Sequence, residues 1–198
     1  MKKADLDADP IVQFTIWLQQ AVEAGLPEPT AMTLATASAD GVPAARMVLL
    51  KGCDPRGFIF FSNYESAKGH DLAANPRAAL VFFWAPLERQ VRVAGDVSRL
   101  SPEESDAYFA SRPRGSRLGA LASRQSSVIP NREALERRLA EVETLYPSDA
   151  IPRPAYWGGF LVAPRWIEFW QGRPSRLHDR LRYTRQPDEA WTVERLAP

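Results

Sequence analysis

The spacing of apolar residues predicts a helix at the start of the chain. After Asp9-Pro10, apolar side chains recur at the spacing of one helix face until Gly25: Ile11, Phe14, Leu18 and Val22. Aspartate is a favoured N-cap, proline is tolerated at the first helical position, and glycine commonly follows a helix end. We therefore expect a short tail over residues 1–8 and an amphipathic helix over residues 9–25.

Short apolar runs bounded by turn residues follow this helix. They cover 31–37, 44–50, 57–62, 78–84 and 89–100, and then 157–164, 166–171, 181–184 and 190–196. Asp40-Gly41, between the first two runs, predicts a hairpin, because Asp-Gly suits the tight turns that join antiparallel strands. Most connections are too short for crossover helices, so we expect antiparallel pairing, and many short strands favour a small closed barrel.

Residues 101–146 are predicted to form a helical insertion between barrel strands. Ser101-Pro102-Glu103-Glu104 has the form of a capping box. Residues 131–145 place Leu135, Leu139 and Val142 on one face among charged residues, as a packed surface helix does. Because no repeat, low-complexity tract or linker interrupts the 198 residues, we expect a single domain over residues 1–198.

Composition mainly excludes classes of function. A formal net charge of +1 argues against a general binder of nucleic acid or membrane surfaces. Cys53 is the one cysteine, so a reducing compartment is expected, and no membrane-spanning run or signal peptide is found. We therefore expect a cytoplasmic protein.

The common motifs of reactive sites are absent from the sequence. There is no Gly-x-Gly-x-x-Gly and no Gly-x-Ser-x-Gly, and Gly52 and Gly57 have P-loop spacing without the Lys-Ser/Thr that must follow. Two histidines and one cysteine, far apart, make poor zinc ligands, so no metal site is expected. The chemistry of an enzyme with this sequence is expected to belong to an organic cofactor.

Arginine is concentrated in two segments of this nearly neutral chain. Residues 165–185 contain six arginines and only two acidic residues, Glu168 and Asp179. Residues 112–132 contain no acidic residue and five arginines: Arg112, Arg114, Arg117, Arg124 and Arg132. Guanidinium groups match phosphate and carboxylate in bidentate fashion, so the segments indicate either local anion sites or solvated surface arginines.

Several segments carry polar residues that helix and strand formation do not require. They are ARMVLLK (45–51), FFSNYESAKGHDL (60–72), YFASRPRGSRLGALASRQSS (108–127) and EFWQGRPSRLHDRLRY (168–183). With LERQV (87–91), WGGF (157–160) and RLAP (195–198), they resemble the pyridoxamine 5′-phosphate oxidase family from about Asp9 to Pro198. The resemblance implies a mainly β protein with flanking helices (α+β), an antiparallel split β-barrel that forms a homodimer with two sites at the interface.

The same resemblance implies an activity. Pyridoxine or pyridoxamine 5′-phosphate would be oxidised to pyridoxal 5′-phosphate, with hydride passing to FMN, dioxygen as the electron acceptor and hydrogen peroxide as the product.

FMN binding is implied for residues of several segments. The FMN phosphate is expected beside Arg46, Lys68 and the Ser62 hydroxyl, with Gln125 and Ser126 supplied by the partner subunit. Gln90, Trp170 and Arg180 match isoalloxazine contacts, and the implied set also includes Met47, Val48, Leu49, Leu50, Lys51 and Phe61. Arg46 and Lys51 lie five apart, so on a regular strand they point to opposite faces, which requires a bulge or separate uses of the two faces.

The substrate phosphate is implied to lie at a second cationic group made by Lys51, Tyr108, Arg112 and Ser116. Tyr108 and Arg112 are four apart, so they share a face of the predicted helix. Arg176 and His178, two apart on an expected extended segment, project to one side and would cover the substrate ring opposite the flavin. We expect them to position the substrate, because alignment itself lowers a barrier substantially. Asp179 is expected to hold a neighbouring arginine, and Arg173 and Arg182 to be surface residues.

Two features depart from the family pattern, and two rival functions stay open. Ala67 stands where many relatives have arginine, which would cost roughly 1.5–3 kcal/mol of FMN affinity unless another group substitutes. The tail before Asp9 is shorter than the basic arm of many relatives.

The rivals are a related flavin oxidase of dihydrophenazine precursors and a non-catalytic carrier of flavin or pyridoxal phosphate. Tyr108, Arg112 and Ser116 argue against the first rival, because a phosphate-free substrate has no use for them.

Overall fold

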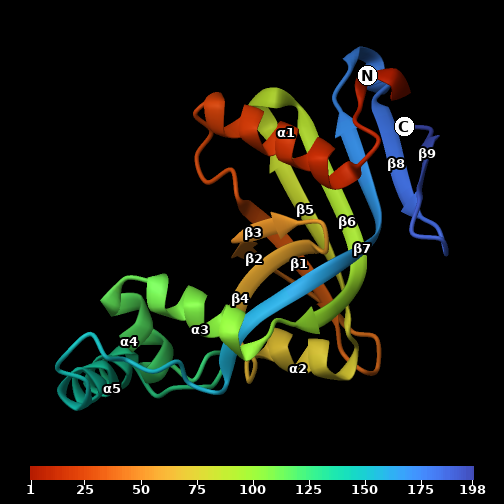
Figure 1. Cartoon of the computed structure of the whole chain (residues 1–198). Coiled ribbons are helices and arrows are strands. Elements are labelled where there is room, and N and C mark those ends of the chain that lie inside the picture. Colours follow the sequence, from red (N-terminus) through yellow and green to blue (C-terminus); the bar gives the residue numbers. More distant parts are fainter.

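The computed structural model describes residues 1–198, and its nine strands form one antiparallel sheet (Figure 1). The strand order is β2-β1-β5-β6-β7-β4-β3, and β8 and β9 continue the sheet from the C-terminal half of β7. The strands are β1 (Ala31–Ala37), β2 (Pro43–Leu49), β3 (Gly52–Asp54), β4 (Gly57–Asn63), β5 (Arg77–Trp84), β6 (Arg89–Arg99), β7 (Trp157–Gln171), β8 (Asp179–Arg185) and β9 (Trp191–Arg195).

Four of the five α-helices, all except α4, begin after a residue whose side chain caps the helix. They are α1 (Pro10–Glu23), α2 (Ala67–Ala74), α3 (Pro102–Ser111), α4 (Arg114–Ala122) and α5 (Arg132–Leu145), with 3-10 turns η1 (Lys3–Asp5), η2 (Ala85–Leu87) and η3 (Pro174–Arg176). The Asp9 carboxylate accepts a hydrogen bond from the Ile11 amide, and the Ser101–Glu104 capping box is present, as predicted. None of the helices is long and apolar enough to cross a membrane.

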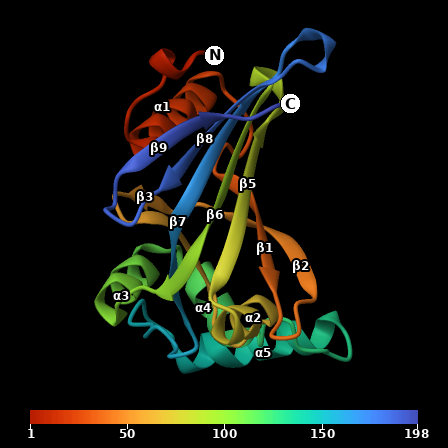
Figure 2. The same ribbon diagram turned by 90° about the vertical axis from the view of Figure 1, so that its right-hand side faces the viewer.

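The predicted strands are confirmed, with two corrections. The runs 157–164 and 166–171 form the single strand β7, because a register shift between Ala94 and Gly95 of β6 accommodates Pro164. Proline is tolerated in a sheet at such irregularities. The sheet curls, but its edge strands β2 and β3 share no ladder (Figure 2). The split barrel is therefore confirmed, and the fully closed barrel is wrong.

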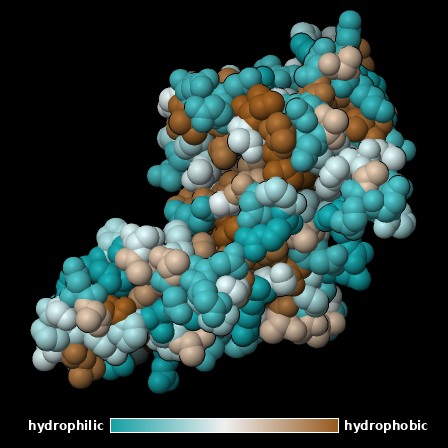
Figure 3. All heavy atoms as spheres, viewed as in Figure 1, coloured by the Kyte–Doolittle hydropathy of each residue, from teal (hydrophilic) through white to brown (hydrophobic).

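Helix α1 fills the concave side of the curled sheet with aromatic side chains. The ring of Phe14 lies 4.8 Å from that of Phe58 and 4.9 Å from that of Phe82, and Trp17 lies 5.2 Å from Phe169. Each aromatic side chain buries a large apolar area, so this contact anchors α1 to strands from both halves of the sheet. In the view of Figure 3, apolar side chains gather near α1, whereas the lobe of α3–α5 is mostly hydrophilic.

A second apolar cluster joins α3, α4 and α5 to the start of β7. Its buried members are Phe109, Leu118, Ala122, Val142, Ile151 and Trp157. The helical lobe therefore lies at one end of β7, and η3 and β8 lie at the opposite end (Figure 1). Trp157 and Trp170 are 13 residues apart on this strand, or at most about 43 Å at roughly 3.3 Å per residue.

Candidate active site

A cleft of about 490 Å³ lies between β2, the end of β4, α2 and the start of the helical lobe. Its volume is within the usual range for small-molecule sites. Four cationic side chains and no acidic one are among the residues that line it: Arg46, Met47, Val48, Leu49, Lys51, Phe61, Ser62, Lys68, Tyr108, Arg112, Pro113, Ser116, Gln125 and Trp157. The structure thus brings both predicted phosphate-binding groups into one cationic cleft.

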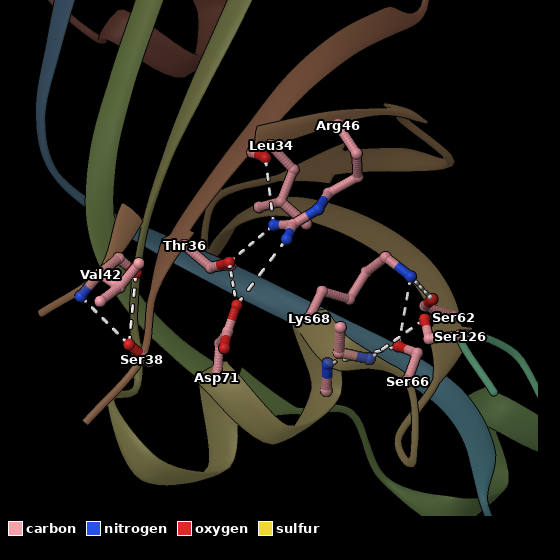
Figure 4. Close-up of polar contacts among 12 residues, drawn as sticks. Leu34, Thr36, Ser38, Val42, Arg46, Ser62, Ser66, Lys68, Asp71 and Ser126 are labelled. Atoms are coloured by element: carbon pink, nitrogen blue, oxygen red, sulfur yellow. Dashed lines mark hydrogen bonds and ion pairs between the residues drawn. The ribbon is translucent and has the colours of Figure 1, made fainter. Parts of the chain in front are cut away.

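Lys68 provides a buried positive charge on one side of the cleft. The residue is 8% exposed, and its ammonium donates to Ser62 Oγ (3.2 Å) and Ser66 Oγ (3.2 Å) (Figure 4). It also donates to Gln125 Oε1 at 3.1 Å, so all three partners are neutral. Burial, and secondarily the charge of Arg46, lowers the pKa of Lys68 from its ordinary value. A desolvated cation with only neutral partners favours an anionic ligand.

Arg46 and Lys51 line the same cleft, although they lie five residues apart. Strand β2 ends at Leu49, so Lys51 is outside it and the rule of opposite faces does not extend to this side chain. The prediction that the two residues need a bulge or separate faces is therefore wrong. Leu50 does not line the cleft, because its side chain is 5% exposed within the apolar core.

Gln125 and Ser126 differ from the prediction in their subunit. Both reach the Lys68 region from the same chain, on the segment that follows α4. Gln125 Oε1 accepts hydrogen bonds from Lys68 and Ser62, and Ser126 Oγ accepts one from the Ala67 amide at 3.2 Å. The resemblance gave the residue types and assigned them to the partner subunit, whereas this chain brings its own Gln125 and Ser126 to its own Lys68 region. The partner subunit is not needed to supply them.

The second cationic group is built around the Trp157 ring. The Arg112 guanidinium lies 4.5 Å from that ring, and Tyr108 stacks on Phe61 with 3.7 Å between ring centroids. The predicted shared helix face of Tyr108 and Arg112 is wrong, because α3 ends at Ser111 and Arg112 is extended. Pro113 explains this conformation, since the residue before proline is disfavoured in the helical region.

Arg112 has an unfulfilled hydrogen-bonding group at this position. Its Nη1 is buried without a hydrogen-bond partner, and burial lowers the pKa of the guanidinium. Buried polar atoms in folded proteins nearly always have a partner. An oxyanion in the cleft would supply one, with Lys51, Tyr108 and Ser116 on the same lining.

The remaining predicted residues form a second group at the far end of β7, which we call the Trp170 group: Gln90, Trp170, Arg176, His178 and Arg180. Gln90 and Arg180 are the ladder partners of Trp170 on β6 and β8, and the His178 ring lies 4.6 Å from the Trp170 ring. None of the five lines the cationic cleft. Within one chain the structure therefore separates the predicted site into two parts.

The loop that carries Arg176 and His178 is not extended. Ser175 and Arg176 have φ values of 58° and 60°, in the left-handed region, so the expected same-side projection of Arg176 and His178 does not apply. The backbone amide of Arg173 donates to His178 Nδ1 at 3.1 Å. In the neutral imidazole this bond leaves the proton on Nε2.

Asp179 fixes the base of this loop. Its carboxylate accepts hydrogen bonds from the Met1 α-ammonium (2.8 Å), Arg173 (2.8 Å) and Arg195 (2.7 Å). The same groups, in that order, hold the pKa of Asp179 well below its usual range. The prediction that Asp179 holds a neighbouring arginine is confirmed. Arg173 is exposed, as predicted, and pairs with Asp179, whereas Arg182 is half-buried and pairs with Glu194.

Three polar residues beside the site were not predicted. Glu168, 3% exposed, receives two hydrogen bonds from Arg180, at 2.8 and 3.1 Å. Thr36 and Asp71 contact Arg46. Only Thr36 offered a signal, a hydroxyl side chain at a position where the apolar alternation of β1 places core residues. Trp157 was noted only within its motif.

Comparison with known proteins gives matches along nearly the whole chain. Residues 18–146 match the family model described as pyridoxamine 5′-phosphate oxidase, and residues 157–198 match the pyridoxine 5′-phosphate oxidase C-terminal dimerisation region. The chain is 58% identical to the pyridoxine/pyridoxamine 5′-phosphate oxidase of Cupriavidus pinatubonensis, over 100% of this chain and 93% of that protein. It is 60% identical to the enzyme of that name from Paraburkholderia phymatum, over 98% and 92% of the two chains.

Two solved structures share the fold. PhzG from Burkholderia lata 383, in complex with tetrahydrophenazine-1-carboxylic acid, has a TM-score of 0.93 and 33% identity over 98% of this chain and 95% of that one. A pyridoxamine 5′-phosphate oxidase-related, FMN-binding protein from Nostoc punctiforme has a TM-score of 0.78 and 19% identity, over 98% and 100% of the two chains. The second likeness shows the fold alone.

Proposed function

The chain belongs to the pyridoxamine 5′-phosphate oxidase family, and we propose that it oxidises pyridoxine and pyridoxamine 5′-phosphate to pyridoxal 5′-phosphate, with FMN as cofactor and dioxygen as electron acceptor. The observation that carries this proposal is the acid-free cleft with cationic side chains on two sides. FMN and the substrate each bring one phosphate, so this reaction needs two cationic groups in one site. The single cysteine fits a reducing compartment such as the cytoplasm.

We assign the FMN phosphate to Lys68, Arg46, Ser62 and Gln125. The buried ammonium of Lys68 and the guanidinium of Arg46 supply charge-assisted hydrogen bonds, which are the strong ones. Ser126 holds the Ala67 amide at the first turn of α2. Ser126 therefore supports the helix that carries Lys68. It does so through Ala67, the position where many relatives have arginine.

We assign the substrate phosphate to Arg112, Tyr108, Ser116 and Lys51. The unpaired Nη1 of Arg112 supports this assignment, and all four side chains can donate hydrogen bonds to phosphate oxygens. Tyr108 stacks on Phe61, which restricts the motion of the tyrosine ring. The side chain of Tyr108 therefore loses little further conformational entropy when its hydroxyl binds a ligand.

We infer that the Trp170 group acts on the cleft of the partner subunit. Two observations support this. Trp170 and Trp157 are separated by a length of β7 of at most about 43 Å, and residues 157–198 match a dimerisation region. FMN, when bound, supplies hydride acceptance and reaction with dioxygen. With FMN bound, Gln90 and Arg180 would donate hydrogen bonds to the flavin ring, which would favour its reduction. Arg176 and His178 align the substrate, and His178 presents Nε2–H.

A second candidate function is oxidation of a reduced phenazine precursor. The TM-score of 0.93 to the phenazine-acid complex favours keeping it as an alternative. The cationic group of Arg112 and Lys51, with Tyr108 and Ser116, weighs against it, because a substrate without phosphate leaves this wall unused.

One assay on the purified protein separates these functions. The bound flavin is identified by absorbance and mass spectrometry, and formation of pyridoxal phosphate and hydrogen peroxide is followed with pyridoxamine phosphate, pyridoxine phosphate and a dihydrophenazine acid. We expect bound FMN, peroxide and pyridoxal phosphate. Turnover of the phenazine acid alone would favour the second function, and a yellow protein that consumes no oxygen would indicate a carrier.

A further inference from the structure

Thr36 is a polar residue on the buried side of an otherwise apolar strand. In β1 the side chains of Met32, Leu34 and Thr36 are buried in alternation with partly exposed residues. Met32 and Leu34 are fully buried in the core, whereas Thr36 is 4% exposed and carries a hydroxyl group. A buried hydroxyl is unfavourable unless it is hydrogen-bonded, so the partners of Thr36 indicate what it does.

The partners of Thr36 are one cation and one carboxylate (Figure 4). Arg46 Nη1 donates to Thr36 Oγ1 at 2.6 Å, and Thr36 Oγ1 lies 2.6 Å from Asp71 Oδ2. An ionised carboxylate only accepts, so the hydroxyl gives its single proton to Asp71 and receives one from Arg46. The order of donors and acceptors is thereby fixed. Arg46 Nη2 also forms an ion pair with the same Asp71 oxygen at 3.7 Å, beyond hydrogen-bonding distance, so the hydrogen-bonded connection from Asp71 to Arg46 runs through Thr36.

This network ties down one edge of the Arg46 guanidinium. Arg46 lies opposite Leu34 in the β1–β2 register, and its Nη1 also lies 3.4 Å from the Leu34 carbonyl oxygen. Nε and Nη2 make no hydrogen bond within the chain, although Arg46 lines the cationic cleft. These groups are left for a ligand in the cleft.

Helix α2 links this network to the other cation of the FMN-phosphate group. Lys68 and Asp71 are three apart on α2, about one turn, so the same helix supplies the ammonium of the cleft and the carboxylate that holds Thr36. The relative placement of Arg46 and Lys68 therefore depends on a contact between β1 and α2.

We propose that Thr36, held by Asp71, is a positioning residue that keeps the Arg46 guanidinium oriented to bind a phosphate group in the cleft. The inference rests on the proposed function, in which this group is the FMN phosphate. A guanidinium already held in its binding orientation loses less side-chain freedom when the ligand arrives, which increases affinity. The Thr36 hydroxyl, between Asp71 and Arg46, holds the guanidinium in one orientation. It also keeps the Asp71 carboxylate out of hydrogen-bonding distance of the guanidinium.

The test measures binding of FMN and of riboflavin, which lacks the phosphate, to the flavin-free dimer by quenching of flavin fluorescence. Thr36→Val keeps the shape of the side chain and removes the hydroxyl. We expect it to raise the Kd of FMN about tenfold, or ~1.4 kcal/mol, and to leave the Kd of riboflavin unchanged. Thr36→Ser, which restores the hydroxyl, should return the Kd of FMN to within about twofold of wild type.

Three controls make the result specific. Thr15→Val on α1 makes the same change at a hydroxyl that bonds the Ile11 carbonyl, and it should alter neither Kd. In an Arg46→Ala background, Thr36→Val should add no further loss, because a residue that acts through Arg46 has no effect without it. Thr36→Ala carries the same expectation as Thr36→Val if the valine variant does not fold.

Two kinds of outcome would overturn the proposal. An unchanged FMN Kd in Thr36→Val, or equal losses for FMN and riboflavin, would reduce Thr36 to a packing role. An additive loss in the Arg46→Ala background would show that Thr36 does not act through Arg46. A wild-type protein that binds neither flavin would instead refute the proposed function, and the inference with it.

Discussion

Removal of the Arg112 guanidinium tests the substrate-phosphate assignment directly. Its Nη1 is buried without a partner beside the Trp157 ring, and we expect a substrate phosphate oxygen to occupy that position. A hydrogen bond to a charged group contributes about 1.5–3 kcal/mol, which corresponds to roughly 10- to 150-fold in affinity. We therefore expect Arg112→Ala to raise the KM for pyridoxamine phosphate by about that factor, with the FMN content of the wild type.

Lost packing is the competing explanation, because the Arg112 side chain also covers the rings of Trp157 and Phe109. Arg112→Met keeps most of the apolar length and removes the charge, so it should share the raised KM of Arg112→Ala. Arg132→Ala removes an exposed arginine of α5 and should behave as wild type. Initial rates of pyridoxal phosphate formation, with flavin content and Tm, provide the comparison. An unchanged KM in Arg112→Ala, or a KM restored by Arg112→Met, would refute the assignment.

Three further predictions concern Lys68 in the cationic cleft, His178 in the Trp170 group and Asp179 at the base of its loop. Lys68→Met should weaken FMN binding by about tenfold or more, measured as flavin retained after gel filtration, because a charge-assisted hydrogen bond is lost. His178→Ala should lower kcat while flavin content holds, and wild-type turnover would make His178 a surface residue. Asp179 has a depressed pKa in the folded state, so its stabilising effect is present above the unfolded pKa of about 4 and is lost as the pH falls below it. Urea unfolding should show wild type more stable than Asp179→Asn at pH 7, with the difference shrinking below about pH 4.

The elements that could be predicted are those that local chemistry specifies. The Asp40-Gly41 hairpin, the Asp9 cap and the Ser101 capping box each depend on residues close in sequence, and all three are present. The three-residue strand β3 was not predicted, because Gly52, Cys53 and Asp54 are too few to show an apolar alternation, although their pairing with β4 is local. The continuity of β7 through Pro164 likewise depends on the irregularity in the neighbouring strand β6.

The sequence allowed the residues of the site to be predicted, but not how they are arranged in space. The resemblance identified Lys68, Arg112 and Gln125, and the structure brings all three to one cleft. It assigned Gln125 and Ser126 to the partner subunit, whereas here they lie beside Lys68 and Ala67 of their own chain, because their placement depends on the path of the chain after α4. Thr36 was missed because a threonine within AMTLATA is equally compatible with an ordinary strand residue.

The length of β7 determines how defects in different subunits combine. Because we infer that the Trp170 group of each subunit acts on the cleft of the partner subunit, a dimer of Arg112→Ala with His178→Ala would contain one site with both defects and one site with neither. Mixing and refolding the two impaired variants in equal amounts, with the assay at substrate concentrations far below the KM of Arg112→Ala, should therefore recover about one quarter of wild-type activity, since about half of the dimers are mixed. The two variants would rescue each other in a test tube, as alleles with separate lesions do in a cell.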